Sequence, residues 1–125
     1  MGLDEVQAAY DVALRRVTAD FVGSLIDMAE VLVDVTDPDE IQYRFLRRDG
    51  TGHGSRLPAH EDIEAVTAEL ARPFQEDILE SLWGPAWPVC PGHPHPAEPD
   101  LREGLAVWRC PTTTEVVGRI GSLRG

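Results

Sequence analysis

The density of proline between residues 85 and 99 constrains this chain more than any other feature of its sequence. Six of the fifteen residues in that stretch are proline. Each proline fixes its own φ angle and lacks a backbone N–H donor, so neither a helix nor the centre of a sheet is expected there. We expect one domain, residues 1–125, in which this loop joins an α/β body at 1–83 to a C-terminal segment at 84–125 packed on it.

The same loop contains residue types that bind metal ions. Cys90, His93 and His95 lie within it, and Cys110 follows the next strand-like stretch. Cysteine sulfur and histidine nitrogen are the usual zinc ligands, and a Cys-Pro-x-His turn places two of them on one tight loop. The spacer before Cys110 has about the length that zinc fingers and ribbons use between ligand pairs. We therefore predict a zinc site made by Cys90, His93, His95 and Cys110.

Two short motifs carry a resemblance to a known family. Cys90-Pro91-Gly92-His93 and Trp108-Arg109-Cys110-Pro111 resemble the two Cys-Pro knuckles of a rubredoxin-like zinc ribbon in a degenerate form. The resemblance extends from Trp83 to Leu123 and implies two knuckles joined by a β-hairpin, with zinc between them. In that family the second knuckle supplies two ligands, whereas Thr113 stands here where the fourth ligand belongs.

The fourth ligand position leaves several alternatives open. His95 there gives a closed, structural site, and a histidine from elsewhere, such as His53 or His60, could take the same place. Water in that position gives an open site, at which a zinc-bound hydroxide could act as a nucleophile. A ribbon that has lost its metal would keep the two cysteines as small buried apolar side chains.

An amphipathic helix is predicted at the N-terminus, because apolar side chains recur there at steps of three and four residues. Asp4 and Glu5 suit the positive end of its dipole, and Gly23 is expected to weaken or end it. The apolar positions are Val6, Tyr10, Leu14, Val17, Phe21, Leu25 and Met28.

A β-hairpin is predicted next. Residues 30–36 are rich in β-branched side chains and residues 41–45 alternate apolar with polar, with a turn at 37–40 between them. The alternative is a short helix within 37–49, since Asp37 could cap it and Pro38 could occupy its first position. We favour the hairpin because alternating valines provide its first strand.

Residues 49–54 contain three glycines and are predicted to form a flexible turn. The stretch lacks the lysine and the spacing of a phosphate-binding loop. Four arginines near this stretch make the only locally basic region of the sequence. A small anion or an acidic helix of a neighbouring protein could bind there. The competing expectation is that the chain's own carboxylates neutralise these arginines. They are Arg44, Arg47, Arg48 and Arg56.

A second helical pattern begins after Pro58 and continues to Leu82. Pro73 lies inside it, so we expect either two short helices or one helix kinked at that proline. The acidic residues along this segment are expected to form a solvated face. Together these patterns predict an α+β protein: an N-terminal amphipathic helix, a β-hairpin, a helical segment, a C-terminal proline-rich loop and a zinc-ribbon-like β-hairpin.

The charge of the chain restricts its partners. There are 22 acidic and 11 basic residues, for a formal net charge of -11. Nucleic acids and anionic membranes bind basic surfaces, so neither is an expected partner. No stretch is apolar enough to span a membrane, and charged residues interrupt any signal-peptide pattern, so we expect a cytoplasmic protein with reduced thiols. The absence of lysine and asparagine indicates a GC-rich genome, of the kind actinobacteria have.

These observations favour a binding protein over an enzyme. We expect a small, acidic, non-catalytic accessory protein that contains structural zinc and acts through a protein partner. One alternative is a small zinc-dependent enzyme with an open Cys/His site. The other is an acidic binder without metal, similar to immunity proteins or antitoxins, because a charge of -11 suits a basic target.

Overall fold

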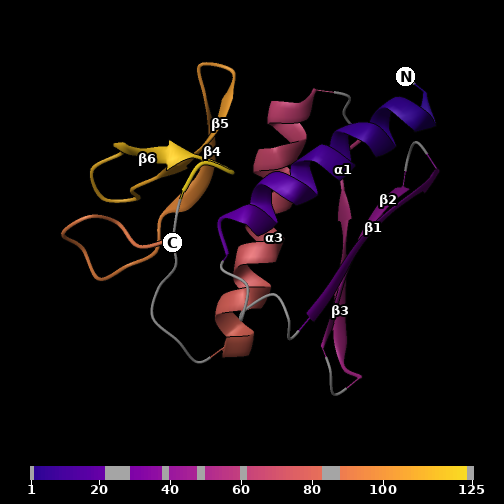
Figure 1. Cartoon of the computed structure of the whole chain (residues 1–125), viewed down its shortest axis with the longest axis horizontal. Coiled ribbons are helices and arrows are strands. Elements are labelled where there is room, and N and C mark those ends of the chain that lie inside the picture. The colour runs from indigo at the N-terminus through magenta and orange to yellow at the C-terminus, as the bar shows by residue number, and fades with distance from the viewer. Residues whose placement is uncertain are drawn as a thin grey trace.

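The fold has three layers, shown edge-on in Figure 1: a middle layer of helices lies between two antiparallel sheets. The computed structural model describes residues 2–21, 29–37, 40–47, 50–59, 62–82 and 88–123. This arrangement confirms the predicted α+β class. In the described part of the chain the elements are α1 (Leu3–Ala19), β1 (Ala29–Asp37), β2 (Glu40–Arg47), β3 (Gly52–Leu57), α3 (Ile63–Leu82), β4 (Glu98–Arg102), β5 (Leu105–Arg109) and β6 (Val116–Arg119).

Helix α1 confirms the predicted N-terminal helix, and its apolar face is buried. Val6, Tyr10 and Val17 have no exposed surface. The helix ends at Ala19, earlier than the apolar pattern suggested, and Asp20 caps it with its backbone N–H directed to the last turn. Gly23, Leu25 and Met28 lie outside the described residues.

The predicted hairpin is confirmed, and the alternative helix within 37–49 is wrong. Strands β1 and β2 pair in antiparallel register from Ala29 with Arg47 to Asp37 with Glu40. Alternation explains the outcome, because a strand places Ile41, Tyr43 and Phe45 together on the buried face, where each is at most 1% exposed. The turn residues 38–39 lie outside the described part.

The prediction of a turn over 49–54 is corrected by strand β3, which begins at Gly52. This strand pairs with β2, so that Ser55 lies opposite Tyr43 and Leu57 opposite Ile41. Glycine has a low intrinsic preference for strands, and the pattern therefore suggested a turn. Pairing with β2 and burial of Leu57, which is 8% exposed, override that preference.

Helix α3 is a single helix that contains Pro73, which settles the alternatives in favour of one helix. Proline removes one backbone hydrogen bond from a helix. Buried residues on both sides of it, Leu70, Phe74 and Ile78, offset that loss by packing into the core. His60 and Glu61 before the helix lie outside the described residues. No described helix is both long enough and apolar enough to cross a membrane.

The second sheet, with strand order β4-β5-β6, covers the opposite side of the helices (Figure 1). Strand β4 was not predicted, because Pro99 lies within it. Proline is tolerated in this strand because β4 lies at the edge of the sheet in the part of the chain that the structure describes. Side chains of α3 hold this edge: Gln75 donates to the carbonyl of Ala97 at 2.7 Å, and Arg72 donates to the carbonyl of Pro99 at 3.1 Å.

An aromatic cluster joins the three layers. The ring of Phe74 on α3 lies 5.0 Å from that of Phe21 and 6.3 Å from that of Phe45 on β2. Phe21 in turn lies 6.0 Å from Trp108 on β5, and all these contacts have edge-to-face geometry. Trp108 therefore packs strand β5 against the aromatic core, whereas Trp83 and Trp87 lie outside the described residues.

Candidate metal centre

The first of two turns at this centre contains Cys90, His93 and His95. It is closed by two backbone hydrogen bonds, from the N–H of Cys90 to the carbonyl of His95 at 3.2 Å and from the N–H of His93 to the carbonyl of Cys90 at 3.1 Å. Gly92 at its tip has a φ of +76°, a conformation that favours glycine. The surrounding prolines restrict the backbone further, so this loop presents its side chains from a stiff frame.

The second turn follows β5 and begins at Cys110. The N–H of Thr114 donates to the carbonyl of Cys110 at 2.9 Å, and the N–H of Cys110 donates to the carbonyl of Glu115 at 2.8 Å. The backbone N–H groups of Thr112 and Thr113 are directed at the Cys110 sulfur. This turn therefore holds a cysteine sulfur among hydrogen-bond donors, an arrangement that stabilises a thiolate.

The two turns bring Cys90, His95 and Cys110 together. Their ligand atoms all lie within 4.8 Å of one another, so the cluster could hold a metal ion. Ligand atoms around tetrahedral zinc are about 3.3 to 3.8 Å apart, given zinc–ligand bonds of about 2.0 to 2.3 Å. Small side-chain rotations would therefore bring all three atoms into range.

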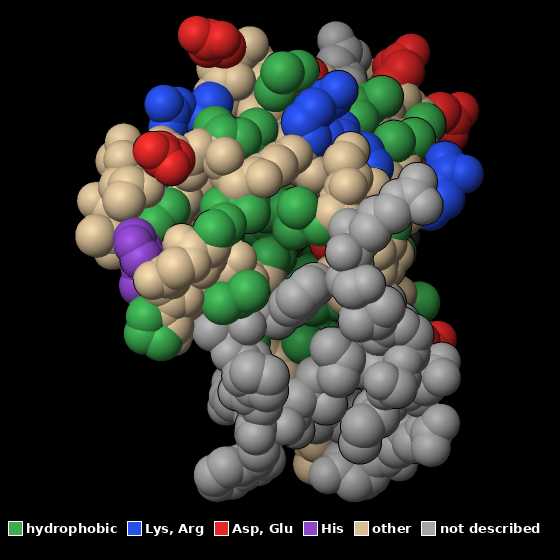
Figure 2. Space-filling view, turned by 60° about the vertical axis from the view of Figure 1, so that its left-hand side comes forward, with side chains coloured by type: hydrophobic (Ala, Val, Ile, Leu, Met, Phe, Trp, Pro, Cys, Tyr) green, Lys and Arg blue, Asp and Glu red, His purple; other side chains and the backbone are tan. Residues whose placement is uncertain are grey.

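The cluster is buried on its sulfur side and reaches the surface on its histidine side. Cys90 is 2% exposed and Cys110 is 4% exposed, while His93 and His95 are partly buried. Figure 2 shows histidine side chains, in purple, at the surface of the molecule. A metal ion at this point would be shielded by protein on the side of the thiols.

His93 lies next to the other three predicted ligands. Its Nδ1 is 3.4 Å from the Cys110 sulfur, and its ring centre is 4.9 Å from that of His95. His93 thus lies beside Cys110 and His95, while Cys90, His95 and Cys110 form the group whose ligand atoms are all close together. Of the other histidines considered as ligands, His60 lies outside the described residues, and so does the side chain of His53.

The two ring nitrogens of His95 differ in their surroundings. Its Nε2 is hydrogen-bonded to the hydroxyl of Thr112 at 3.0 Å, whereas its Nδ1 is buried and has no hydrogen-bond partner among the residues that the structure describes. A buried polar atom without a partner is costly, and such atoms commonly mark an ion or water site. A hydrogen bond to the second nitrogen is also the usual way in which a metal-binding histidine is oriented.

The two thiols differ strongly in acidity. The hydroxyl and backbone N–H of Thr113, with the N–H of Thr112 and the thiol of Cys90, lower the pKa of Cys110 to about 6 against the effect of burial. Burial and the hydrogen bond to Cys110 raise the pKa of Cys90 to about 11. At neutral pH the pair is therefore one thiol donating to one thiolate, and thiolate is the form that binds metal.

The sequence pattern did not reveal the contribution of Thr112 and Thr113. Thr113 occupies the fourth ligand position of the ribbon pattern, and in the structure its hydroxyl donates to the Cys110 sulfur instead. Thr112 connects the second turn to His95 of the first turn. Their position directly after Cys110-Pro111 was the only available signal, and side chains in a tight turn often hydrogen-bond to its first residue.

Comparison with known proteins gives no relative: no protein-family model, no curated protein and no solved structure matches the chain.

Proposed function

We propose that this chain is a non-catalytic binding protein whose C-terminal sheet is stabilised by a structural zinc ion and which acts through a protein partner. The ion would be bound by Cys90, His93, His95 and Cys110. The observation that carries the proposal is the group formed by Cys90, His95 and Cys110 from two separate turns. His93 Nδ1 lies 3.4 Å from the Cys110 sulfur, and the buried Nδ1 of His95 has no hydrogen-bond partner among the described residues.

The choice of zinc rests on the chemistry of the donors. Two sulfurs and two imidazole nitrogens match the ligand set of structural tetrahedral zinc sites, and calcium or magnesium would require oxygen ligands. The thiolate of Cys110 is already favoured by its surroundings, which lowers the free energy needed to form the site.

A structural role is favoured over a catalytic one, because four protein donors fill the tetrahedron and leave no position for water or substrate. The location of the cluster supports the same conclusion. It connects the loop before β4 to the turn between β5 and β6, and so cross-links the ends of a sheet whose strands are only four or five residues long. A metal there would contribute folding free energy to the segment that most needs it.

Metal analysis of the protein, purified without an affinity tag, tests this proposal directly. We expect about one zinc per chain; less than about 0.2 zinc per chain would overturn it. His95→Ala should lose the metal or weaken its binding by at least about tenfold. His53→Ala is the matched control, since the sequence left His53 as an alternative ligand, and this variant should keep its zinc.

Cobalt substitution separates a structural site from an open catalytic one. Cobalt in a closed site with four protein ligands should have an absorption spectrum that does not respond to added azide. A spectrum that changes with azide would indicate an exchangeable fourth ligand and would favour the alternative of a small zinc enzyme.

A further inference from the structure

The only two cysteines of the chain lie beside each other at the metal centre. The sulfurs of Cys90 and Cys110 are at most 4.8 Å apart, and both residues are free thiols in the structure. A disulfide bond is about 2.0 Å long, so each sulfur needs to move by at most about 1.4 Å to form one. The two sulfurs are therefore placed to bind each other as well as a metal ion.

The two turns that carry these sulfurs have backbone hydrogen bonds of their own. In the first turn the N–H of Cys90 donates to the carbonyl of His95 at 3.2 Å, and in the second the N–H of Thr114 donates to the carbonyl of Cys110 at 2.9 Å. Neither bond involves a sulfur, so both can persist when the metal leaves. A bond between the two sulfurs would then replace the metal as the covalent link between the turns.

The burial of the sulfur pair restricts which oxidants can reach it. Cys90 is 2% exposed and Cys110 is 4% exposed. The Cys110 sulfur lies 3.4 Å from Nδ1 of His93, whose side chain is only partly buried, so the histidine side is the shortest approach from solvent. An oxidant of protein size is excluded from this position, whereas hydrogen peroxide is little larger than a water molecule.

We propose that Cys90 and Cys110 form a redox switch, in which a hydroperoxide oxidises the two zinc-bound thiolates to a disulfide that releases the zinc and keeps the two turns cross-linked. This inference rests on the proposed function, because it assumes that both sulfurs bind zinc. Oxidation then changes the histidine side of the centre, where His93 and His95 lose the metal, while the rest of the fold is retained.

The reaction consists of two displacement steps. The thiolate of Cys110, which lies nearer the histidine side, attacks one oxygen of the peroxide, so that an S–O bond forms, the O–O bond breaks and hydroxide leaves. The thiolate of Cys90 then attacks the sulfenic sulfur, so that the S–S bond forms, the S–O bond breaks and a second hydroxide leaves. Two electrons pass from the sulfurs to the peroxide oxygens, and two protons from solvent convert both hydroxides to water. Zinc is released because it binds thiolates and not disulfide sulfur.

Treatment of the zinc-loaded full chain with about a tenfold excess of hydrogen peroxide tests the proposal. A chromogenic chelator measures the released zinc, and mass spectrometry of a non-reduced tryptic digest measures the disulfide. The two cysteines fall in different tryptic peptides, residues 57–102 and 110–119, and both methionines, which peroxide also oxidises, lie outside them. We expect release of about one zinc per chain, together with a joined peptide that is lighter than the sum of its parts by two hydrogens.

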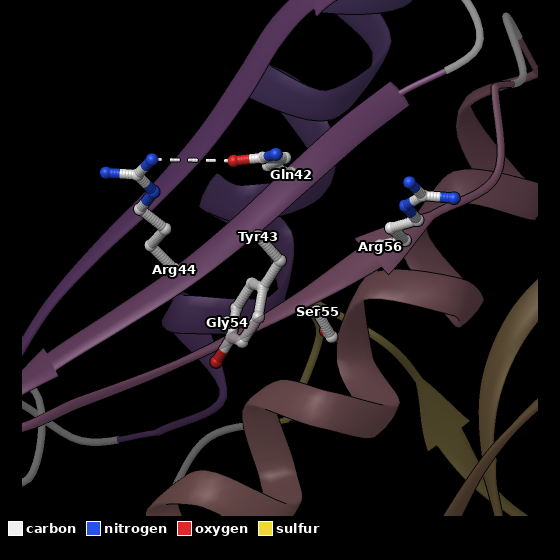
Figure 3. A pocket seen from close by; sticks show the side chains of 6 residues that line it. All are labelled: Gln42, Tyr43, Arg44, Gly54, Ser55 and Arg56. Carbon is white, nitrogen blue, oxygen red and sulfur yellow. Dashed lines mark hydrogen bonds between the residues drawn. The ribbon is translucent and has the colours of Figure 1, made fainter.

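The oxidised chain should keep its near-ultraviolet circular dichroism, because Trp108 stays packed against Phe21. Dithiothreitol followed by zinc should restore the original metal content. Cys90→Ala should form no joined peptide, and dimedone should trap its sulfenic acid at Cys110. Ser55→Ala is the matched control, since it exchanges a side chain of similar size for alanine in the hollow between β2 and β3 of the other sheet, which Figure 3 shows. This variant should release zinc and form the joined peptide as the original chain does.

Three results with the original chain would overturn the proposal: no joined peptide after peroxide, a joined peptide only in chains that migrate as dimers on a non-reducing gel, or sulfinic acids on the separate peptides as the main product. Loss of the near-ultraviolet spectrum on oxidation would also overturn it. The zinc content before peroxide tests the proposed function, whereas the joined peptide tests the redox step. A failure of this inference is therefore distinguishable from a failure of the proposed structural zinc.

Discussion

The indole Nε1 of Trp108 on β5 donates to Oδ2 of Asp20 at the end of α1, over a distance of 2.7 Å. The same carboxylate accepts the backbone N–H of Gly121 at 2.6 Å and that of Leu123 at 3.0 Å. Asp20 is only 1% exposed. One buried carboxylate thus attaches the C-terminal sheet to the first helix, although burial raises its pKa and makes its ionised form costly.

Removing this carboxylate should destabilise the whole fold. In Asp20→Ala one buried N–H donor, that of Trp108, and two part-buried ones, those of Gly121 and Leu123, lose their acceptor. An unsatisfied buried donor costs about 1 to 3 kcal/mol and a part-buried one less, so we expect a loss of about 3 kcal/mol in the free energy of unfolding. Urea denaturation followed by tryptophan fluorescence measures this loss. Asp11→Ala, on the exposed side of α1, is the control and should change stability by less than about 0.5 kcal/mol. Equal effects of the two substitutions would contradict the assigned role of Asp20.

Glu64 makes stability depend on pH in the acid range. Its carboxylate accepts hydrogen bonds from Arg16 and Arg119 and from the N–H of Ala106, and the bond from Arg16 contributes most to lowering its pKa from 4.5 to about 2. Because the pKa is lower in the folded state, this stabilisation is fully present above about pH 4.5 and is lost as the pH falls towards about 2.

The comparison of Glu64→Gln with the original chain isolates this effect. The difference in unfolding free energy between the two should decrease by about 2 kcal/mol from about pH 6 to about pH 3, since only the original chain has the carboxylate. Glu69→Gln, at an exposed position of α3, should show no such decrease. A difference that does not vary with pH would show that the folded state does not depend on ionised Glu64.

Local patterns predicted the parts of the fold that depend on side-chain periodicity. The steps from Val6 to Val17 indicated α1, and the alternating valines indicated β1, because burial follows the period of each element. Strand β3, which pairs with β2, and strand β4, which pairs with β5, could not be predicted. Neighbouring strands accommodate the glycines of β3 and the proline of β4, and local sequence patterns carry no information about these neighbours. Donor type and spacing also predicted Cys90, His95 and Cys110, which the structure brings together in a group that could hold a metal ion. The hydrogen bonds of Thr112 and Thr113 depend on how the turn folds back on itself.

Thr112→Val tests how His95 is oriented. Valine has nearly the shape of threonine but cannot hydrogen-bond to Nε2 of His95, so the ring would lose the contact that fixes it. We expect zinc affinity, measured by competition with a chelator, to fall by about tenfold while the zinc content at saturation stays unchanged. Ser122→Ala, at an exposed position away from the cluster, should have the affinity of the original chain. Unchanged affinity in Thr112→Val would show that His95 needs no such support.

The acidity of the two thiols predicts a two-step titration in the metal-free protein. Cys110 has its pKa lowered to about 6, chiefly by the hydroxyl of Thr113, and Cys90 has its pKa raised to about 11, chiefly by burial. The thiolate absorbance should therefore increase by one thiolate per chain around pH 6 and by a second only in strong alkali, as apparent values of a coupled pair. Cys110→Ser should remove the first step, while Cys90→Ala should retain it at a somewhat higher pH, because the Cys110 thiolate loses one donor. Circular dichroism at each pH verifies that the body stays folded, which its aromatic core permits without metal. In folded protein, simultaneous ionisation of both thiols at about pH 8.5 would contradict the thiol–thiolate pair.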